Sequence, residues 1–277
     1  MIRLGTTTTL RSLRTTSVGF YLGDEEGNDI LLPYKYVPEG FAVGQDIEVF
    51  VYADSEDRPI ATTLRPKAQV DEFAMMVVKD TGPHGAYLDW GLEKDLFLPF
   101  GEQRGRREVG DEVLVFVYND DRTGLPVASE RLNTFLVKDD IRVVSGDEVD
   151  LLVTDRSDLG YNVIVNGLYQ GLIYFSDVRE RLQRGQRLKG NVARVRPDGK
   201  LDVRPGATGL AAMTDASTVI LEALKANGGH LALHDNSDPE MISQKLRMSK
   251  KLFKKTIGTL FRQELIWIDD DGIRQRK

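Results

Sequence analysis

The first two hundred residues show a series of short apolar runs separated by turn residues. One glycine precedes a β-prone run and a second precedes another run 25 residues later, in three pairs: Gly19 and Gly44, Gly85 and Gly110, Gly160 and Gly185. A third apolar run lies between the glycines of each pair, at 30–34, 96–100 and 172–176. A further run follows each second glycine, and a last run closes each unit. This spacing predicts three repeats of about five strands each.

Each repeat is too small to leave its sheet open. An open sheet exposes two edge strands, and closing the sheet into a small barrel removes them. The OB-fold is the common closed form for five strands, and an SH3-like barrel is an alternative that periodicity does not separate from it. We therefore expect a mainly β chain with three tandem OB-like barrels, over 1–66, 67–145 and 146–206.

After Gly209 the pattern changes to helical periodicity. The predicted elements are a helix from Thr214 or Asp215 to about Asn227, a short strand at 230–233, a helix starting at Pro239, a helix over 250–263, and a hairpin of 265–268 and 273–276. This order is that of a winged helix-turn-helix. The prediction adds an α/β domain over 210–277 to the three barrels.

Composition excludes several classes of chemistry. The 277 residues include no cysteine, which excludes a disulfide scaffold, a cysteine-ligated metal site and a thiol nucleophile. His230 and His234 have a metal-like spacing, but the residues between them predict a strand rather than a helix. The sequence has no phosphate-binding loop and no nucleophile elbow. We expect a non-catalytic protein with no metal, no other cofactor and no small-molecule substrate.

The chain carries no sequence signal for a membrane or for export. Its apolar runs are all shorter than the roughly 18 residues of a membrane-spanning helix. Basic residues near the N-terminus are not followed by the apolar stretch of a secretory signal. We expect a cytoplasmic protein without a membrane partner.

The net charge of −6, taken whole, argues against a nucleic-acid partner. The charge is uneven when it is counted by segment. Residues 1–146 carry 16 Lys and Arg against 25 Asp and Glu, whereas 147–209 carry 10 against 9 and 210–277 carry 11 against 9. The acidity therefore belongs to the first two repeats, and the third repeat and the C-terminal domain can still bind a polyanion.

The third repeat carries motifs of a known domain. Its run at 171–176 follows Gly160, a strand with Lys189 follows Gly185, and a turn of sequence Asp-Gly-Lys-Leu lies at 198–201. These features resemble the S-one domain, the OB-fold RNA-binding repeat named for the largest small-subunit ribosomal protein. The first two repeats resemble it more weakly, since Pro33 and Pro99 lie where that domain prefers isoleucine.

The order of domains is similar to that of the conserved virulence factor B (CvfB) family over essentially the whole chain. Members of that family are cytosolic bacterial proteins thought to bind RNA. The resemblance implies an RNA-binding protein that regulates gene expression at the RNA level.

The S-one resemblance also implies an RNA-binding face. It consists of the aromatic of the second strand, the residue before that strand's glycine, and a histidine position in the third strand. On this sequence these positions are Leu159, Asn162 and Tyr174 in the third repeat, His84, Tyr87 and Leu98 in the second, and Val18, Tyr21 and Leu32 in the first.

Residue chemistry makes the third repeat the chief candidate. Tyr161 and Tyr174 offer stacking surfaces, and a stacked base contributes about 1–3 kcal/mol. For Tyr161, which flanks Gly160, packing in the barrel core is favoured over stacking, although it stays among the candidate contacts. The cations expected next to RNA phosphates are Lys189, Arg194, Arg196 and Lys200, for which solvation alone is the alternative.

The first two repeats are weaker candidates because acidic loops at 24–26 and 120–121 repel phosphate. We expect them to act partly as spacers or protein-contact modules. The second repeat does have a local basic loop with Arg104, Arg106 and Arg107, for which a merely solvated loop is the alternative.

The third helix of the winged-helix domain carries basic residues on its polar side: Lys250, Lys251, Lys254, Lys255 and Arg262. In this fold that helix can enter a nucleic-acid groove. Winged helices also serve as protein-contact modules, and the acidic tip at 269–271 disfavours a wing that lies on phosphate.

Together these patterns predict a protein that binds single-stranded or structured RNA across the third barrel and the winged helix. Two alternatives remain. One is a transcriptional regulator that binds duplex DNA through the winged helix, and the other is a protein-interaction scaffold.

Overall fold

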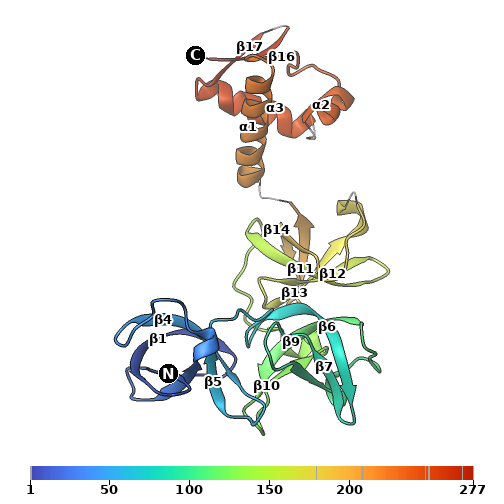
Figure 1. Ribbon diagram of the computed structural model, residues 1–277. Coiled ribbons are helices and arrows are strands. Elements are labelled where there is room, and N and C mark those ends of the chain that lie inside the picture. Colours follow the sequence, from blue (N-terminus) through green and yellow to red (C-terminus); the bar gives the residue numbers. More distant parts are fainter. Residues whose placement is uncertain are drawn as a thin grey trace.

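The computed structural model describes residues 2–178, 180–206, 209–246, 248, 250–269 and 271–276, and for 209–215 the backbone alone. Three closed five-stranded barrels are followed by a winged-helix region (Figure 1). This confirms the predicted fold class.

The first barrel consists of β1 (Thr6–Thr15), β2 (Gly19–Gly23), β3 (Asp29–Pro33), β4 (Asp46–Ala53) and β5 (Pro59–Thr62). The second consists of β6 (Phe73–Gly82), β7 (Gly85–Leu88), β8 (Leu96–Pro99), β9 (Glu112–Asn119) and β10 (Pro126–Ser129). The third consists of β11 (Glu148–Arg156), β12 (Gly160–Val165), β13 (Tyr169–Tyr174), β14 (Arg187–Val195) and β15 (Leu201–Pro205).

Strand order distinguishes the OB-fold from the SH3-like alternative. In each barrel the strands close in the order first, second, third, fifth, fourth, and the third and fifth strands pair in parallel. This is the five-stranded Greek-key closure of the OB-fold. A short 3-10 helix follows the third strand of every barrel, at Tyr34–Tyr36, Phe100–Glu102 and Phe175–Asp177.

The glycines of the repeat have two separate physical causes. A Cβ added at Gly19, Gly85 or Gly160 would lie 2.1, 2.3 or 1.9 Å from a backbone oxygen of the neighbouring third strand, so no larger residue fits. The glycines 25 residues later instead adopt φ of 81 to 95°, in the left-handed region that suits glycine. The first glycine of each pair is therefore required by strand packing and the second by a turn, which is why glycine recurs at both positions in every repeat.

The barrels are packed on one another through shared apolar clusters. Phe50 of the first barrel packs against Trp90 of the second, with ring centroids 5.5 Å apart. A cluster with residues from both the second and third barrels contains Phe73, Leu114, Phe116, Leu132, Leu136, Leu152 and Ile164. Arg187 of the third barrel donates a hydrogen bond of 2.6 Å to the Phe73 carbonyl. The second and third barrels therefore form one packed unit, which Figure 1 shows in cyan to orange-brown.

The C-terminal region consists of α1 (Gly209–Ala226), β16 (His230–Leu231), α2 (Pro239–Leu246), α3 (Lys250–Arg262), β17 (Ile266–Asp269) and β18 (Gly272–Gln275). Its three strands pair in the order β16, β18, β17. The helices and the hairpin enclose an apolar cluster that includes Ile220, Phe253 and Ile273. The first helix begins at Gly209, five residues before the predicted cap at Thr214, because Leu210 to Met213 are good helix formers that extend it.

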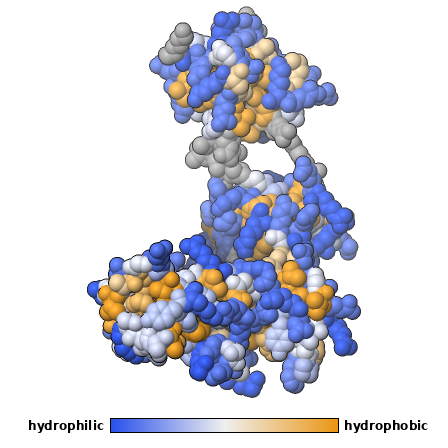
Figure 2. Space-filling model, viewed as in Figure 1, coloured by the Kyte–Doolittle hydropathy of each residue, from blue (hydrophilic) through white to orange (hydrophobic). Residues whose placement is uncertain are grey.

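Hydrophilic residues make up much of the surface in view, and hydrophobic residues are visible on the first barrel (Figure 2). Several of its apolar side chains are exposed, among them Leu13, Val18 and Val43.

Candidate nucleic-acid interface

The outer face of the third barrel carries a polar network around Tyr174. Asn162 on β12 and Tyr174 at the end of β13 are half-buried and alternate with core residues. Arg196 donates a hydrogen bond of 3.0 Å from its Nη2 to the Tyr174 hydroxyl, and one of 2.9 Å from its Nε to Asp202 Oδ1. The hydrogen bond to Asp202 raises the pKa of the Arg196 guanidinium, and the two hydrogen bonds hold this group beside the Tyr174 hydroxyl.

The other predicted cations of this barrel differ in how far they are neutralised. Lys189 forms an ion pair of 2.8 Å with Asp150, which raises the pKa of the lysine. Lys200 lies 3.8 Å from Asp198 across the β14–β15 turn. Arg194 is exposed and has no ion-pair partner among the residues that the structure describes. Arg194 is therefore the most available phosphate contact of the four.

Leu159 and Tyr161, the residues on either side of Gly160, differ in exposure. Leu159, before the strand, is 64% exposed and can lie against a base. Tyr161 is only 6% exposed and packs edge-on against Phe175, with ring centroids 5.4 Å apart. The prediction of a stacking role for Tyr161 is corrected here, because its ring belongs to the barrel core.

The third-strand positions of the first two barrels also need correction. Leu32 and Leu98 are 0% exposed and lie in the barrel cores, so they are not available to RNA. On the adjacent third strand, Gly19, Gly85 and Gly160 pair with Pro33, Pro99 and Tyr174, respectively. The predicted positions were therefore one residue out of register, which turns a strand side chain to the opposite face.

A signal for the correct register was present in the sequence. Pro33, Pro99 and Tyr174 each lie 14 residues after the repeat glycine. This constant spacing, rather than similarity to the apolar run, identifies the equivalent positions. Among these three positions, the third barrel carries an aromatic and the first two carry proline.

The remaining predicted positions of the first two barrels lie outside the cores. Val18 and His84 are exposed, and Tyr87 is partly exposed beside Phe97, with ring centroids 5.4 Å apart. Tyr21 is half-buried beneath the guanidinium of Arg14, whose carbon lies 4.1 Å from the ring centroid. That guanidinium is in turn paired with Asp29 at 2.7 Å.

Predicted-face residues of the first and second barrels meet in one cleft of about 1000 Å³. Its lining includes Val18, Pro33, Tyr87 and Phe97, together with the carboxylates of Asp54, Asp80, Glu93 and Asp95. Lys35 is held 2.5 Å from Glu93, and Lys94 is held 2.6 Å from Asp57. Asp54 and Asp95 are paired with Arg58 and Lys79, and Asp80 has no ion-pair partner within the described part of the chain. Because both lysines of the lining are already paired, this cleft is a poor site for a phosphate backbone.

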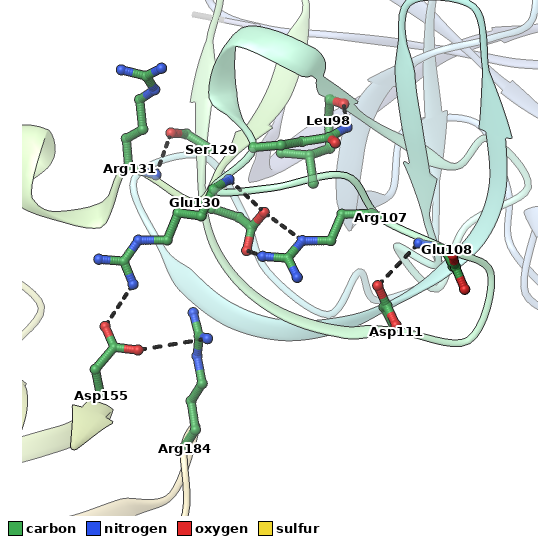
Figure 3. Close-up of polar contacts among 11 residues, drawn as sticks. Leu98, Arg107, Glu108, Asp111, Ser129, Glu130, Arg131, Asp155 and Arg184 are labelled. Carbon is green, nitrogen blue, oxygen red and sulfur yellow. Dashed lines mark hydrogen bonds and ion pairs between the residues drawn. The ribbon is translucent and has the colours of Figure 1, made fainter.

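The basic loop of the second barrel is largely engaged with acidic groups (Figure 3). Arg107 makes a two-point ion pair with Glu130, whose side chain is 0% exposed. Arg104 reaches Asp155 of the third barrel at 2.7 Å. Arg106 is exposed and has no ion pair within the described part of the chain. Arg107 is thus bound to a buried carboxylate rather than displayed to solvent.

Helix α3 carries a basic stripe on the side opposite its buried face. Lys251, Lys255 and Arg262 are exposed along it, and a Cβ at Gly258 between them would meet nothing within 4 Å. Lys254 lies to one side, 3.7 Å from Asp235, and Lys250 is half-buried. The stripe extends about 16 Å at 1.5 Å per residue.

No helix among the described residues is long and apolar enough to cross a membrane. The same residues contain no group of three or more His, Asp or Glu side chains placed to hold a metal ion.

Comparison with known proteins identifies the domain types. A model described as an S1 domain matches residues 4–64 and 72–129, which contain the strands of the first and second barrels. A model described as a CvfB-like winged helix domain matches residues 218–274. Conserved virulence factor B of Staphylococcus epidermidis (strain ATCC 12228 / FDA PCI 1200) is 23% identical over 93% of this chain and 90% of its own. The chain belongs to the CvfB family.

Other relatives of this CvfB-family chain extend over its full length. The uncharacterized protein YitL of Bacillus subtilis is 26% identical over 100% of this chain and 95% of its own. A crystal structure described as a multidomain protein with nucleic acid binding domains from Streptococcus pneumoniae covers 99% of this chain and 98% of its own, at 20% identity and a TM-score of 0.41. The matched models are of nucleic-acid-binding S1 and winged-helix type and describe no catalytic family.

Proposed function

We propose that this CvfB-family protein is a non-catalytic RNA-binding protein that acts as a post-transcriptional regulator of gene expression in the cytoplasm. RNA lies chiefly across the outer face of the third barrel and the basic stripe of α3. The observation that carries this proposal is the Tyr174 site, where a half-buried aromatic ring, Arg196 held between that tyrosine and Asp202, and an exposed Arg194 opposite Asp202 lie on one barrel face.

The chemistry of this face suits single-stranded RNA. Bases stack on aromatic rings without regard to sequence, and guanidinium groups pair with phosphates. Asn162 and Asp202 add hydrogen-bonding groups beside Tyr174 that can meet base edges or ribose hydroxyls. In the first two barrels the equivalent third-strand residue is proline and the neighbouring cleft is acidic, which supports a lesser role for them in RNA binding.

Substitution at the Tyr174 site tests the proposal. Tyr174→Ala with Arg194→Ala in the full-length protein should weaken binding of a labelled oligouridylate by about 10- to 100-fold, from one lost stacking contact and one lost phosphate contact. The matched control is Tyr34→Ala with Arg65→Ala, which removes an exposed tyrosine and an exposed arginine from the first barrel. Equal affinities of the two double variants would show that the third-barrel face is not the site.

Binding measurements with single-stranded RNA and duplex DNA distinguish the proposed function from a DNA-binding regulator and from a scaffold. We expect the unmodified protein to prefer single-stranded RNA over duplex DNA of the same length. Tight binding of duplex DNA without an RNA preference would favour a DNA-binding regulator. No binding of any nucleic acid at low salt would contradict the proposal and favour a scaffold.

A further inference from the structure

The third barrel contains a cationic pocket beside the predicted face. The pocket has a volume of about 500 Å³ and is lined by residues 153–156, Tyr161 and residues 181–184. Three arginines line it, Arg156, Arg181 and Arg184, and Asp155 is the carboxylate in its lining. The sequence offered Arg181 and Arg184 only as members of a basic segment and did not single out Arg156.

Local structure places the arginines at the pocket. A bulge in β11 between Val153 and Arg156 disturbs its pairing with β12, and such bulges re-aim side chains. The Arg156 guanidinium carbon lies 4.9 Å from the centroid of the Phe175 ring, which fixes the cation at the barrel surface. Arg181 is exposed and has no ion-pair partner among the described residues.

The carboxylate of the pocket is shared between the second and third barrels. Asp155 Oδ2 accepts a hydrogen bond of 2.7 Å from Arg104 of the second barrel, while Asp155 Oδ1 lies 3.7 Å from Arg184 of its own barrel. Figure 3 shows Asp155 next to Arg184 at this junction. Because Arg104 already neutralises Asp155, the pocket retains an excess of positive charge.

The pocket also adjoins the face proposed for RNA. Tyr161, which lines the pocket, pairs with Arg156 across the strands, and Arg156 contacts the ring of Phe175, the residue after Tyr174. The turn from β11 to β12 therefore has Arg156 on one side and the exposed Leu159 on the other. A strand that crosses the third-barrel face and passes over this turn meets the pocket next.

We infer that this pocket is a phosphate-binding subsite through which RNA continues from the third barrel toward the second. The inference rests on the proposed RNA-binding function and deepens it. A phosphodiester places two charged oxygens where guanidinium groups can pair with them. Arg156 and Arg181 contact the phosphate, Arg184 is drawn from Asp155 toward it, and Asp155 stays bound to Arg104.

Charge-removing variants of the full-length protein test the subsite. Arg156→Gln with Arg181→Gln should weaken binding of an oligouridylate of about 20 nucleotides roughly tenfold near physiological salt. The dependence of log affinity on log salt should become shallower by about 1.4, since each single-strand phosphate contact contributes about 0.7 to that slope.

Two further variants make the result specific. Arg65→Gln with Arg122→Gln removes the same charge from exposed positions of the first two barrels and should change affinity and slope far less. Asp155→Asn removes the carboxylate from the pocket and should strengthen RNA binding a few-fold, whereas a purely structural role for Asp155 predicts weaker binding. Unchanged Trp90 fluorescence in a Trp267→Phe background shows for each variant that the second barrel, which shares a buried cluster with the third, remains folded.

The outcomes separate this inference from the proposed function. If the Arg156 and Arg181 variant matches the Arg65 and Arg122 control while Tyr174→Ala with Arg194→Ala still weakens binding, the subsite is wrong and the RNA-binding face stands. If the pocket variant loses binding of uridine monophosphate but not of the oligomer, the pocket is a mononucleotide site and the inference is overturned. If the unmodified protein binds no RNA, both fail.

Discussion

Glu130 directly follows the last strand of the second barrel, and its side chain is 0% exposed. Arg107 pairs with both of its oxygens at 2.8 and 2.5 Å, and the Arg104 backbone amide donates to Oε2 at 3.1 Å (Figure 3). A buried carboxylate costs free energy unless it is paired, so Arg107 is tied to the stability of the barrel. Arg107 and Arg106 are adjacent in sequence, but only Arg107 is bound to a buried carboxylate, while Arg106 is exposed.

We predict that Arg107→Ala lowers the free energy of unfolding of the second barrel by about 3 kcal/mol, because Glu130 is left without its cation. Trp90 is buried in this barrel and Trp267 is the second tryptophan of the chain, so Trp90 fluorescence in a Trp267→Phe background reports its unfolding in urea. The matched control, Arg106→Ala, should change the midpoint little. A double variant, Arg107→Met with Glu130→Leu, should recover part of the loss, and failure of Arg107→Ala to shift the midpoint would contradict the assignment.

At the scale of elements, the contact between the second and third strands explains both a success and an error of sequence reasoning. The glycine that opens the second strand was found by its spacing, and its cause is close approach to the third strand. The third-strand positions Leu32 and Leu98 were aligned by apolar similarity and proved to be core residues. Similarity of composition does not fix register in a strand, because neighbouring residues face opposite sides.

We predict that Gly85→Ala destabilises the second barrel by about 2 kcal/mol or more, since the new Cβ would lie 2.3 Å from the Leu98 oxygen. The control is Gly101→Ala in the same barrel, where a Cβ meets nothing within 4 Å. Trp90 fluorescence in urea measures both variants in the Trp267→Phe background. Equal midpoints for the two would show that the strand contact is not tight.

At the scale of the whole molecule, the second and third barrels share a buried core and are not independent of one another. Leu152 and Ile164 of the third barrel are buried in one cluster with Phe73, Leu114 and Phe116 of the second. Arg187 and Arg104 each bridge the same two barrels, to the Phe73 carbonyl and to Asp155. A nucleic acid that binds the third barrel therefore meets a surface that the second barrel helps to hold in place.

We predict that Leu152→Ala lowers the unfolding midpoint reported by Trp90, although Leu152 belongs to the third barrel. The loss of a buried leucine costs about 2 to 4 kcal/mol, and the shared cluster transmits this loss to the second barrel. Ile242→Ala makes a similar truncation in the winged-helix cluster, which contains no residue of the barrels. It should leave the Trp90 midpoint unchanged, and an unchanged midpoint in Leu152→Ala would mean that the two barrels unfold separately.

Local sequence patterns were enough to predict the three repeats, the winged helix and the family resemblance, whereas strand order was needed to separate the OB-fold from an SH3-like barrel. These features rest on local periodicity, on glycines that a turn or a close contact demands, and on charge counted by segment. The sequence also placed Tyr174, Asn162 and Arg194 on a barrel surface where the structure has them. Each of these depends on neighbours within one repeat.

The three-dimensional arrangement of the chain was needed to show which charges are available and which strand each repeat glycine contacts. Arg107 and Arg104 look alike in sequence, but one holds buried Glu130 and the other crosses to Asp155, 51 residues away. The cationic pocket of Arg156, Arg181 and Arg184 arises from a strand end and a loop that are brought together by barrel closure. Pairing between distant residues depends on how the chain closes and packs, and local sequence patterns do not encode that geometry.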